Sequence, residues 1–230
     1  MIRAITFDVG GTLADGGLDK KAFMRKVVDY LSGLGYGVSP RSYRKSLDKA
    51  MGELQRLRSL GREMSFRDFY SLVLSGLGIS PTEELLSALL GLYFECFISS
   101  PIPGSYEVVR ALSGRYELAV ISNAISPWPR RFLEAQGLKP YFRTIIISGE
   151  VGWRKPHGKV FRIALSRLGV RPHEAIHVGD SPVEDVAGAK AVGMKAVLVA
   201  RGRSLLDLEV EPDAIVEDIR ELPEALKALT

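Results

Sequence analysis

The fold is decided by residues 2–13, which read Ile2-Arg3-Ala4-Ile5-Thr6-Phe7-Asp8-Val9-Gly10-Gly11-Thr12-Leu13. An apolar run with β-branched residues ends at the carboxylate of Asp8, a pattern typical of a strand buried inside a parallel sheet. The two glycines that follow permit a sharp turn and let the backbone approach a ligand closely. Open α/β sheets bind their ligands at the carboxyl ends of the strands. Asp8 can therefore be a nucleophile or a metal ligand, or it can simply cap the turn.

The composition is that of a globular protein with a sizeable core. The chain has 230 residues, of which 46% are hydrophobic and 25% are charged, and its net charge is +4. Lysine and arginine never form a run of five, and no nucleic-acid-reading motif accompanies them, so the charge favours a small anionic substrate, not nucleic acid. The single cysteine, Cys96, excludes an internal disulfide and fits a reducing compartment. With no signal peptide and no apolar run of membrane-spanning length, we expect a cytoplasmic protein without membrane contact. The sequence leaves the oligomeric state open.

Residues 15–99 have a helical periodicity, with no convincing strand among them. Four amphipathic helices are expected here, and they should pack together as a small bundle. Their expected N-terminal caps are Asp15, Ser39, Ser65 and Ser80.

Beyond Pro101 strands and helices alternate, which predicts a parallel sheet flanked by helices. The expected strands are Leu118–Ile121, Thr144–Ile147, Ile176–Val178, Ala196–Val199 and Ala214–Val216. The expected helices are Glu107–Leu112, Arg130–Gln136, Val160–Leu168 and Val183–Ala191. The predicted fold class is therefore α/β, with a Rossmann-like parallel sheet core formed by residues 1–14 and 100–230. A four-helix cap domain, residues 15–99, interrupts this core after its first strand.

Four short polar stretches lie at, or beside, the carboxyl ends of the expected strands. They are residues 8–13, 120–123, 152–156 and 178–185. Because the strand ends of a parallel sheet meet at one crevice, we expect these stretches to form one site. Together they resemble the haloacid dehalogenase (HAD) superfamily, most of whose members hydrolyse phosphate compounds, and in particular its subfamily with a small helical cap. The resemblance covers essentially the whole chain.

The resemblance implies a nucleophile and a metal site. Asp8 would attack a phosphoryl group and form an aspartyl-phosphate. Mg²⁺, a hard cation that prefers oxygen ligands, would be held by Asp8, the backbone carbonyl of Gly10 and Asp180. Asp185, in preference to Glu184, would steady metal-bound water from outside the coordination sphere.

The resemblance also implies the groups that contact the substrate. Ser122 would donate a hydrogen bond to a phosphoryl oxygen, Asn123 would add a second donor, and Lys155 would neutralise the phosphoryl charge and that of Asp8. Two further residues, Gly11 and Thr12, are expected to bind substrate. Neither of the two histidines near these stretches, His157 and His177, has an expected partner, and neither is assigned to catalysis.

One position departs from the pattern of the superfamily. In most of its phosphatases the residue two after the nucleophile is a second Asp, which transfers protons to and from the reacting oxygens, but here it is Gly10. A positioned acid–base group is worth roughly 10²–10⁴-fold in rate. The haloacid dehalogenase-like hydrolase domain-containing 3 proteins resemble this chain in lacking that acid and in having a Gly-Trp-x-Lys-Pro stretch like residues 152–156.

Three functions stay open. The first is a Mg²⁺-dependent phosphatase that acts on a small phosphorylated metabolite. The second is a 2-haloacid dehalogenase in which Asp8 displaces halide, a leaving group that needs no proton. The third is a non-catalytic binding protein that retains the fold. Because dehalogenases of the superfamily generally do without the metal carboxylate, the presence of Asp180 favours the phosphatase.

Overall fold

A computed structural model describes residues 1–202 and 209–229, so residues 203–208 and 230 of the expected core segment lie outside the described residues. The strands are β1 (Ala4–Phe7), β2 (Ala14–Leu18), β3 (Phe97–Pro101), β4 (Glu117–Ser122), β5 (Thr144–Ile147), β6 (Ala175–Gly179), β7 (Lys195–Val199) and β8 (Ala214–Val216). The α-helices are α1 (Lys20–Gly33), α2 (Pro40–Arg58), α3 (Phe66–Gly76), α4 (Glu83–Cys96), α5 (Ser105–Ser113), α6 (Trp128–Ala135), α7 (Ser148–Val151), α8 (Gly158–Leu168), α9 (Gly188–Lys190) and α10 (Leu222–Lys227). Shorter turns are the 3₁₀ segments η1 (Lys139–Tyr141), η2 (Pro172–Glu174) and η4 (Ile219–Glu221) and the π-helical segment η3 (Pro182–Ala187).

Six parallel strands form one sheet in the order β5-β4-β1-β6-β7-β8. All four residues of β1 are buried, which explains its continuous apolar sequence. One face of the sheet packs against α5, α6 and α10, and the opposite face packs against α8 and α9. Each expected strand lies within or coincides with an observed one, so the α/β fold class is confirmed.

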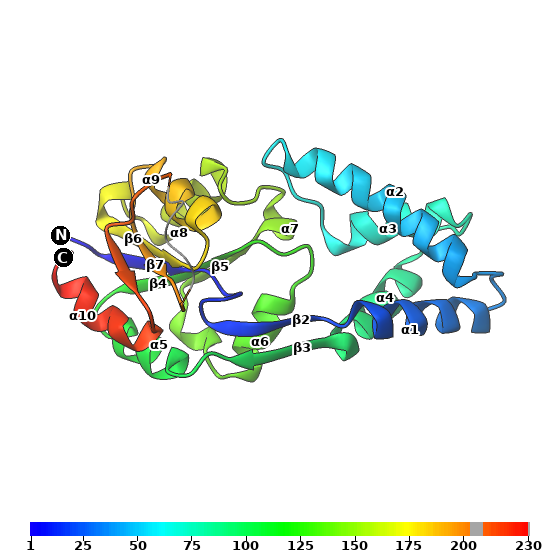
Figure 1. The fold of residues 1–230 in the computed structure, drawn as a ribbon, viewed down its shortest axis with the longest axis horizontal. Coiled ribbons are helices and arrows are strands. Elements are labelled where there is room, and N and C mark those ends of the chain that lie inside the picture. The colour runs from blue at the N-terminus through cyan, green and yellow to red at the C-terminus, as the bar shows by residue number, and fades with distance from the viewer. Residues whose placement is uncertain (203–208, 230) are drawn as a thin grey trace.

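Four helices, α1 to α4, are inserted between β2 and β3 and enclose a hydrophobic core of their own. We call residues 20–96 the helical insert. Figure 1 shows it at one end of the molecule, with β2 and β3 running side by side from the sheet toward it. Two of its expected caps are confirmed, because the Ser39 hydroxyl accepts the N–H of Ser42 and Ser65 forms a capping box with Asp68.

Three expectations about local structure were wrong. Residues 15–18 and 97–99, expected to be helical, instead lie in the antiparallel strands β2 and β3. Asp15 lies in β2, where its carboxylate accepts two hydrogen bonds from Arg201, and Asp19 caps α1 instead. The fourth helix is capped by Thr82, two residues after Ser80.

The helix expected at residues 183–191 is interrupted. Its first part is the π-helical turn η3, and α9 follows it directly. Single π-helical turns of this kind occur often at functional sites. In residues 1–202 and 209–229 no helix has both the length and the apolar composition needed to cross a membrane.

Two adjacent glycines in β2 provide a test of the β2–β3 pairing. A Cβ at Gly16, whose φ is +142°, would lie 2.1 Å from the carbonyl oxygen of Ile98, whereas a Cβ at Gly17 would meet nothing within 4 Å. We expect Gly16→Ala to lower the free energy of unfolding by about 1–3 kcal/mol, the usual cost of a strained backbone position. Gly17→Ala is the matched control and should leave it nearly unchanged. Equal urea midpoints for the two variants would contradict the observed pairing.

Candidate functional site

The polar stretches of the sequence meet at the carboxyl edge of the sheet. Asp8 directly follows β1, and its N–H donates to the carbonyl of Val178 in β6. Ser122 ends β4, and because Phe7 pairs with Val120, β1 and β4 end at the same edge. Asp180 follows β6, so parallel pairing alone brings these side chains to one place.

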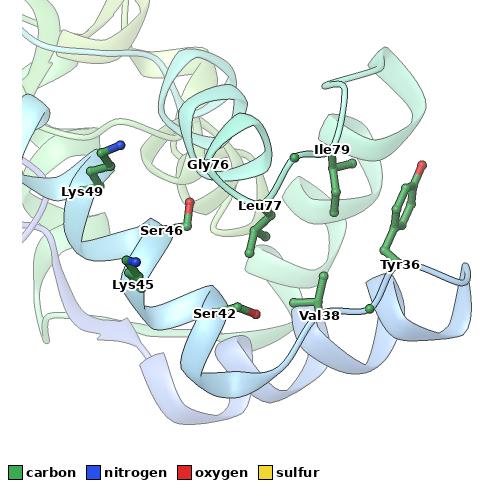
Figure 2. A pocket seen from close by; sticks show the side chains of 11 residues that line it. Tyr36, Val38, Ser42, Lys45, Ser46, Lys49, Gly76, Leu77 and Ile79 are labelled. Atoms are coloured by element: carbon green, nitrogen blue, oxygen red, sulfur yellow. The ribbon is translucent and has the colours of Figure 1, made fainter.

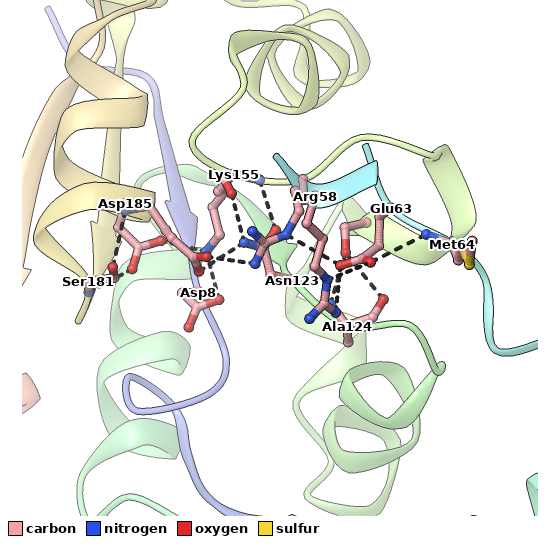
Figure 3. Close-up of polar contacts among 12 residues, drawn as sticks. Asp8, Arg58, Glu63, Met64, Asn123, Ala124, Lys155, Ser181 and Asp185 are labelled. Carbon is pink, nitrogen blue, oxygen red and sulfur yellow. Dashed lines mark hydrogen bonds and ion pairs between the residues drawn. The ribbon is translucent and has the colours of Figure 1, made fainter. Parts of the chain in front are cut away.

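Lys155 lies at the centre of the site. Its side chain is 1% exposed, and its ammonium group donates to Oδ1 of Asp8 at 2.7 Å and to Oδ1 of Asp185 at 2.5 Å (Figure 3). A buried ammonium group needs paired charge and hydrogen bonding, and these two carboxylates supply the opposite charge and accept two of its three N–H groups. The structure thus places Lys155 beside Asp8, where its charge can offset that of the carboxylate.

Burial and the charge of Lys155 shift the pKa values of Asp8 and Asp185 in opposite directions. Burial raises the pKa of Asp8 to about 7, the charge of Lys155 opposes this shift, and the charge of Asp185 adds to it. Burial also disfavours ionisation of Asp185, but the Lys155 charge and a hydrogen bond from His177 outweigh it, so the pKa of Asp185 lies below its usual value. Burial likewise opposes the charge on Lys155, yet the two carboxylates raise its pKa.

A buried histidine supports Asp185 from behind. His177 Nε2 lies 2.9 Å from Oδ1 of Asp185, and His177 Nδ1 lies 2.7 Å from the hydroxyl of Thr6. All three groups are satisfied if Nε2–H donates to Asp185 and the Thr6 hydroxyl donates to Nδ1, and we assign that tautomer. Burial lowers the pKa of His177 and so favours the neutral ring, although the hydrogen bond to Asp185 opposes this shift. Sequence reasoning assigned His177 no partner, although Asp185 lies only eight residues further along the chain; the turn after β6 that brings the two side chains together is not evident from the sequence.

Three carboxylates form a cluster that can hold a metal ion. Oxygens of Asp8, Asp180 and Asp185 lie within 4.8 Å of one another. Lys155 pairs with two of them, Asp8 and Asp185, and a cluster of three hard anionic side chains suits a divalent cation. The backbone of Gly11 makes room for Asp180, since a Cβ at Gly11 would lie 2.1 Å from Oδ2 of that residue. Gly11 also has a φ of +77°, which favours glycine.

The remaining predicted residues lie around this cluster. Gly10 has space beside it, because the nearest atom to a Cβ built there would be Cζ2 of Trp128 at 4.0 Å. Thr12 is fully buried, and its hydroxyl has no hydrogen-bond partner in the described part of the chain. Ser122 is buried at the end of β4.

Asn123 has a different set of contacts from the one expected. Its Oδ1 accepts the backbone N–H of Lys155 at 2.9 Å, and its Nδ2 donates to the carbonyl of Lys155 at 3.0 Å. The same Nδ2 also donates to Glu184 at 2.9 Å, which uses its second proton. In this structure Asn123 therefore holds the backbone of Lys155 and has no donor left for a phosphoryl oxygen.

A second charge cluster, centred on the buried Glu63, joins the helical insert to the loop before α8, and no sequence motif indicated it. The Glu63 carboxylate is paired with Arg58 at 3.0 Å and with Arg154 at 3.4 Å. Arg154 precedes Lys155 and also pairs with Glu184 at 2.7 Å. His157, which was expected to have no partner, caps α8 and stacks on Trp153.

A groove of about 490 Å³ lies in the helical insert, between α2 and the turn after α3. Figure 2 shows Ser42, Lys45 and Lys49 on α2 and Leu77 and Ile79 across from them. None of the strand-end residues lines this groove, so it is separate from the carboxylate cluster.

Comparison with known proteins identifies related sequences and folds. A family model for haloacid dehalogenase-like hydrolases matches residues 2–193. The phosphoserine phosphatase of Thermus thermophilus is 46% identical over 111 residues, which cover 47% of this chain and 45% of that protein. The glyceraldehyde 3-phosphate phosphatase of Pyrococcus furiosus is 30% identical over 99% of this chain and 93% of that protein. A 2-haloacid dehalogenase from Pseudomonas syringae superposes with a TM-score of 0.78, at 24% identity over 100% of both chains.

These likenesses differ in what they establish. At 24% identity the dehalogenase structure shows a common fold only. The Pyrococcus furiosus relative, in contrast, aligns with nearly the whole chain. Because the family model also matches most of the sequence, the protein belongs to the haloacid dehalogenase-like hydrolases.

Proposed function

We propose that this hydrolase is a Mg²⁺-dependent phosphatase that acts on a small phosphorylated metabolite through an aspartyl-phosphate at Asp8. The observation that carries the proposal is the position of Lys155, buried between Asp8 and Asp185 at the strand ends, with Asp180 completing a set of three carboxylates. Relatives named as phosphoserine phosphatase and glyceraldehyde 3-phosphate phosphatase support a small phosphomonoester as the substrate.

Asp8 is the nucleophile in this proposal. Its carboxylate oxygen attacks phosphorus, the bond from phosphorus to the ester oxygen breaks, and the alkoxide formed takes a proton from water. Water then attacks the aspartyl-phosphate, which releases inorganic phosphate and restores the carboxylate. Lys155 donates to Asp8 and so favours its ionised form against the effect of burial.

The metal site fits a hard divalent ion. Asp8, Asp180 and the backbone carbonyl of Gly10 would hold Mg²⁺, and Asp185 would orient its water, in accordance with an all-oxygen donor set. When bound, the ion would supply positive charge next to the phosphoryl oxygens. Ser122 and the backbone at Gly11 are the groups left to contact the substrate, because the Thr12 side chain is fully buried.

The absence of an acid at Gly10 limits the reaction. An alkoxide leaves poorly without a proton donor, whereas acyl and aryl phosphates release stable anions. The protein should therefore be faster on acetyl phosphate and p-nitrophenyl phosphate than on alkyl phosphates. Dehalogenation of 2-haloacids is less well supported, because it does not use the carboxylate of Asp180.

Removal of the nucleophile is the first test. Asp8→Asn should reduce Mg²⁺-dependent hydrolysis of p-nitrophenyl phosphate by roughly 10³-fold or more, because the covalent route is lost. EDTA should abolish the wild-type activity in the same assay. The control is Asp48→Asn, an exposed position on α2, which should be as active as the wild type. Full activity of a folded Asp8→Asn would overturn the proposal, and EDTA-resistant halide release from a 2-haloacid would establish the dehalogenase instead.

Two glycines of the first loop test the metal site. Gly11→Ala places a Cβ against Asp180, so we expect Mg²⁺ affinity, measured by calorimetry, to fall by roughly 10–100-fold, the range for groups that orient a metal ligand. Gly10→Ala is the matched control, since it keeps the backbone carbonyl of that position and its Cβ has space. If both variants bind Mg²⁺ as the wild type does, Asp180 is not a ligand.

The missing acid can be restored. Gly10→Asp has room beside Trp128 and should raise hydrolysis of an alkyl phosphate such as glyceraldehyde 3-phosphate by about tenfold or more, the lower part of the range for an acid–base group. Gly10→Asn has the same shape but cannot transfer a proton at neutral pH, so it should give no gain. Equal rates for the two variants would mean that a different group already transfers the proton.

A further inference from the structure

We propose that Glu63 of the helical insert is a positioning residue for Lys155, so that docking of the insert and alignment of the lysine occur together. The proposal rests on the proposed function in assigning Lys155 to catalysis. Its structural part, a connected series of contacts from Glu63 to Lys155, stands without knowledge of the substrate.

The first contact crosses from the insert to the loop before α8. The Glu63 side chain is fully buried, and its two oxygens face Arg58 of α2 and Arg154 of the loop. Figure 3 shows Glu63 and Arg58 on one side of Asn123 and Lys155 with Asp8 on the other. A buried carboxylate between two guanidinium groups is held in orientation, because the two ion pairs together offset its loss of hydration.

The next contacts lead from Arg154 to the lysine. Arg154 donates to Oε1 of Glu184 at 2.7 Å, and Oε2 of Glu184 accepts from Asn123 at 2.9 Å. Asn123 in turn holds both the N–H and the carbonyl of Lys155. Each contact in this series is a hydrogen bond or an ion pair. A shift of Arg154 therefore disturbs the hydrogen bonds that hold the backbone of Lys155.

Backbone pairing strengthens the same junction. The N–H of Arg154 donates to the carbonyl of Gly61 at 3.1 Å, and the N–H of Glu63 donates to the carbonyl of Gly152 at 3.3 Å. The Arg62 guanidinium lies 4.3 Å from the ring centroid of Trp153, a cation–π contact across the junction. The insert therefore contacts the residues immediately before Lys155 on both backbone and side chains.

The distribution of charges permits this junction to open. If the insert moves away, Glu63 keeps Arg58 within the insert, and Arg154 keeps Glu184. Glu63 and Arg154 then each retain one partner of opposite charge, so moving the insert away does not incur the full free-energy cost of an unpaired buried ion. The ion pair that is lost is the one between Glu63 and Arg154, together with the two backbone hydrogen bonds and the cation–π contact across the junction.

The test uses Glu63→Gln, which keeps the shape of the side chain and removes its charge. Its matched control is Glu53→Gln, which removes an exposed ion pair between Glu53 and Arg56, both of which lie on α2. Hydrogen exchange resolved to single amides by NMR should show faster exchange, by about tenfold or more, at Arg154 and Lys155 in Glu63→Gln only. With p-nitrophenyl phosphate, kcat should fall by roughly 10²-fold, as for a misplaced catalytic group, with little change in KM. Glu63→Asp should recover part of both losses.

Glu184→Gln weakens the contact of Glu184 with Arg154, in the middle of the series. It provides a second test if Glu63→Gln does not fold. It should speed exchange at Lys155 while the amide of Glu63 keeps its protection. Unchanged exchange at Lys155 in both variants, or in Glu184→Gln alone if only that one folds, would overturn the proposal. Because exchange requires no substrate, a protein without phosphatase activity would contradict the proposed function and leave this result interpretable.

Discussion

The site depends on one interaction, the burial of a single ammonium group between two carboxylates. Lys155 cannot stay charged in the interior without Asp8 and Asp185, and those carboxylates cannot both stay ionised without Lys155. This mutual requirement fixes β1, the turn after β6 and the loop before α8 relative to one another. Neighbouring residues keep these groups in position, since His177 binds Asp185 and Asn123 binds the backbone of Lys155.

The sequence predicted the sheet and the position of the site because both follow from local patterns. A buried parallel strand reads as an unbroken apolar run, and the polar residue that ends it must lie at the carboxyl edge. For this reason Asp8, Ser122 and Asp180 could be placed together without coordinates. The expected contact between Lys155 and Asp8 depended on family resemblance, because nothing local to residues 152–156 specifies a partner in β1.

Other features could not be predicted, for physical reasons. Residues 14–18 contain two glycines and no β-branched residue, so their strand exists only through pairing with β3. Asp15 and Asp19 are equally good caps by type, and the choice between them depends on Arg201, far along the chain. Glu63 lies in a polar turn that reads as solvent-exposed. Its burial arises only when α2 and the loop before α8 bring two arginines to it.

The paired strands β2 and β3 determine which motions are available to the helices. Both chain connections to α1–α4 run through this one hydrogen-bonded ribbon (Figure 1). Two separate linkers would let the helices swing and rotate in many directions, but a ribbon resists shear in its own plane and bends most readily across its faces. Bending of this ribbon would therefore carry the four helices together along one arc. Each return along that arc would bring the turn that contains Glu63 back to the loop that contains Arg154 in the same orientation.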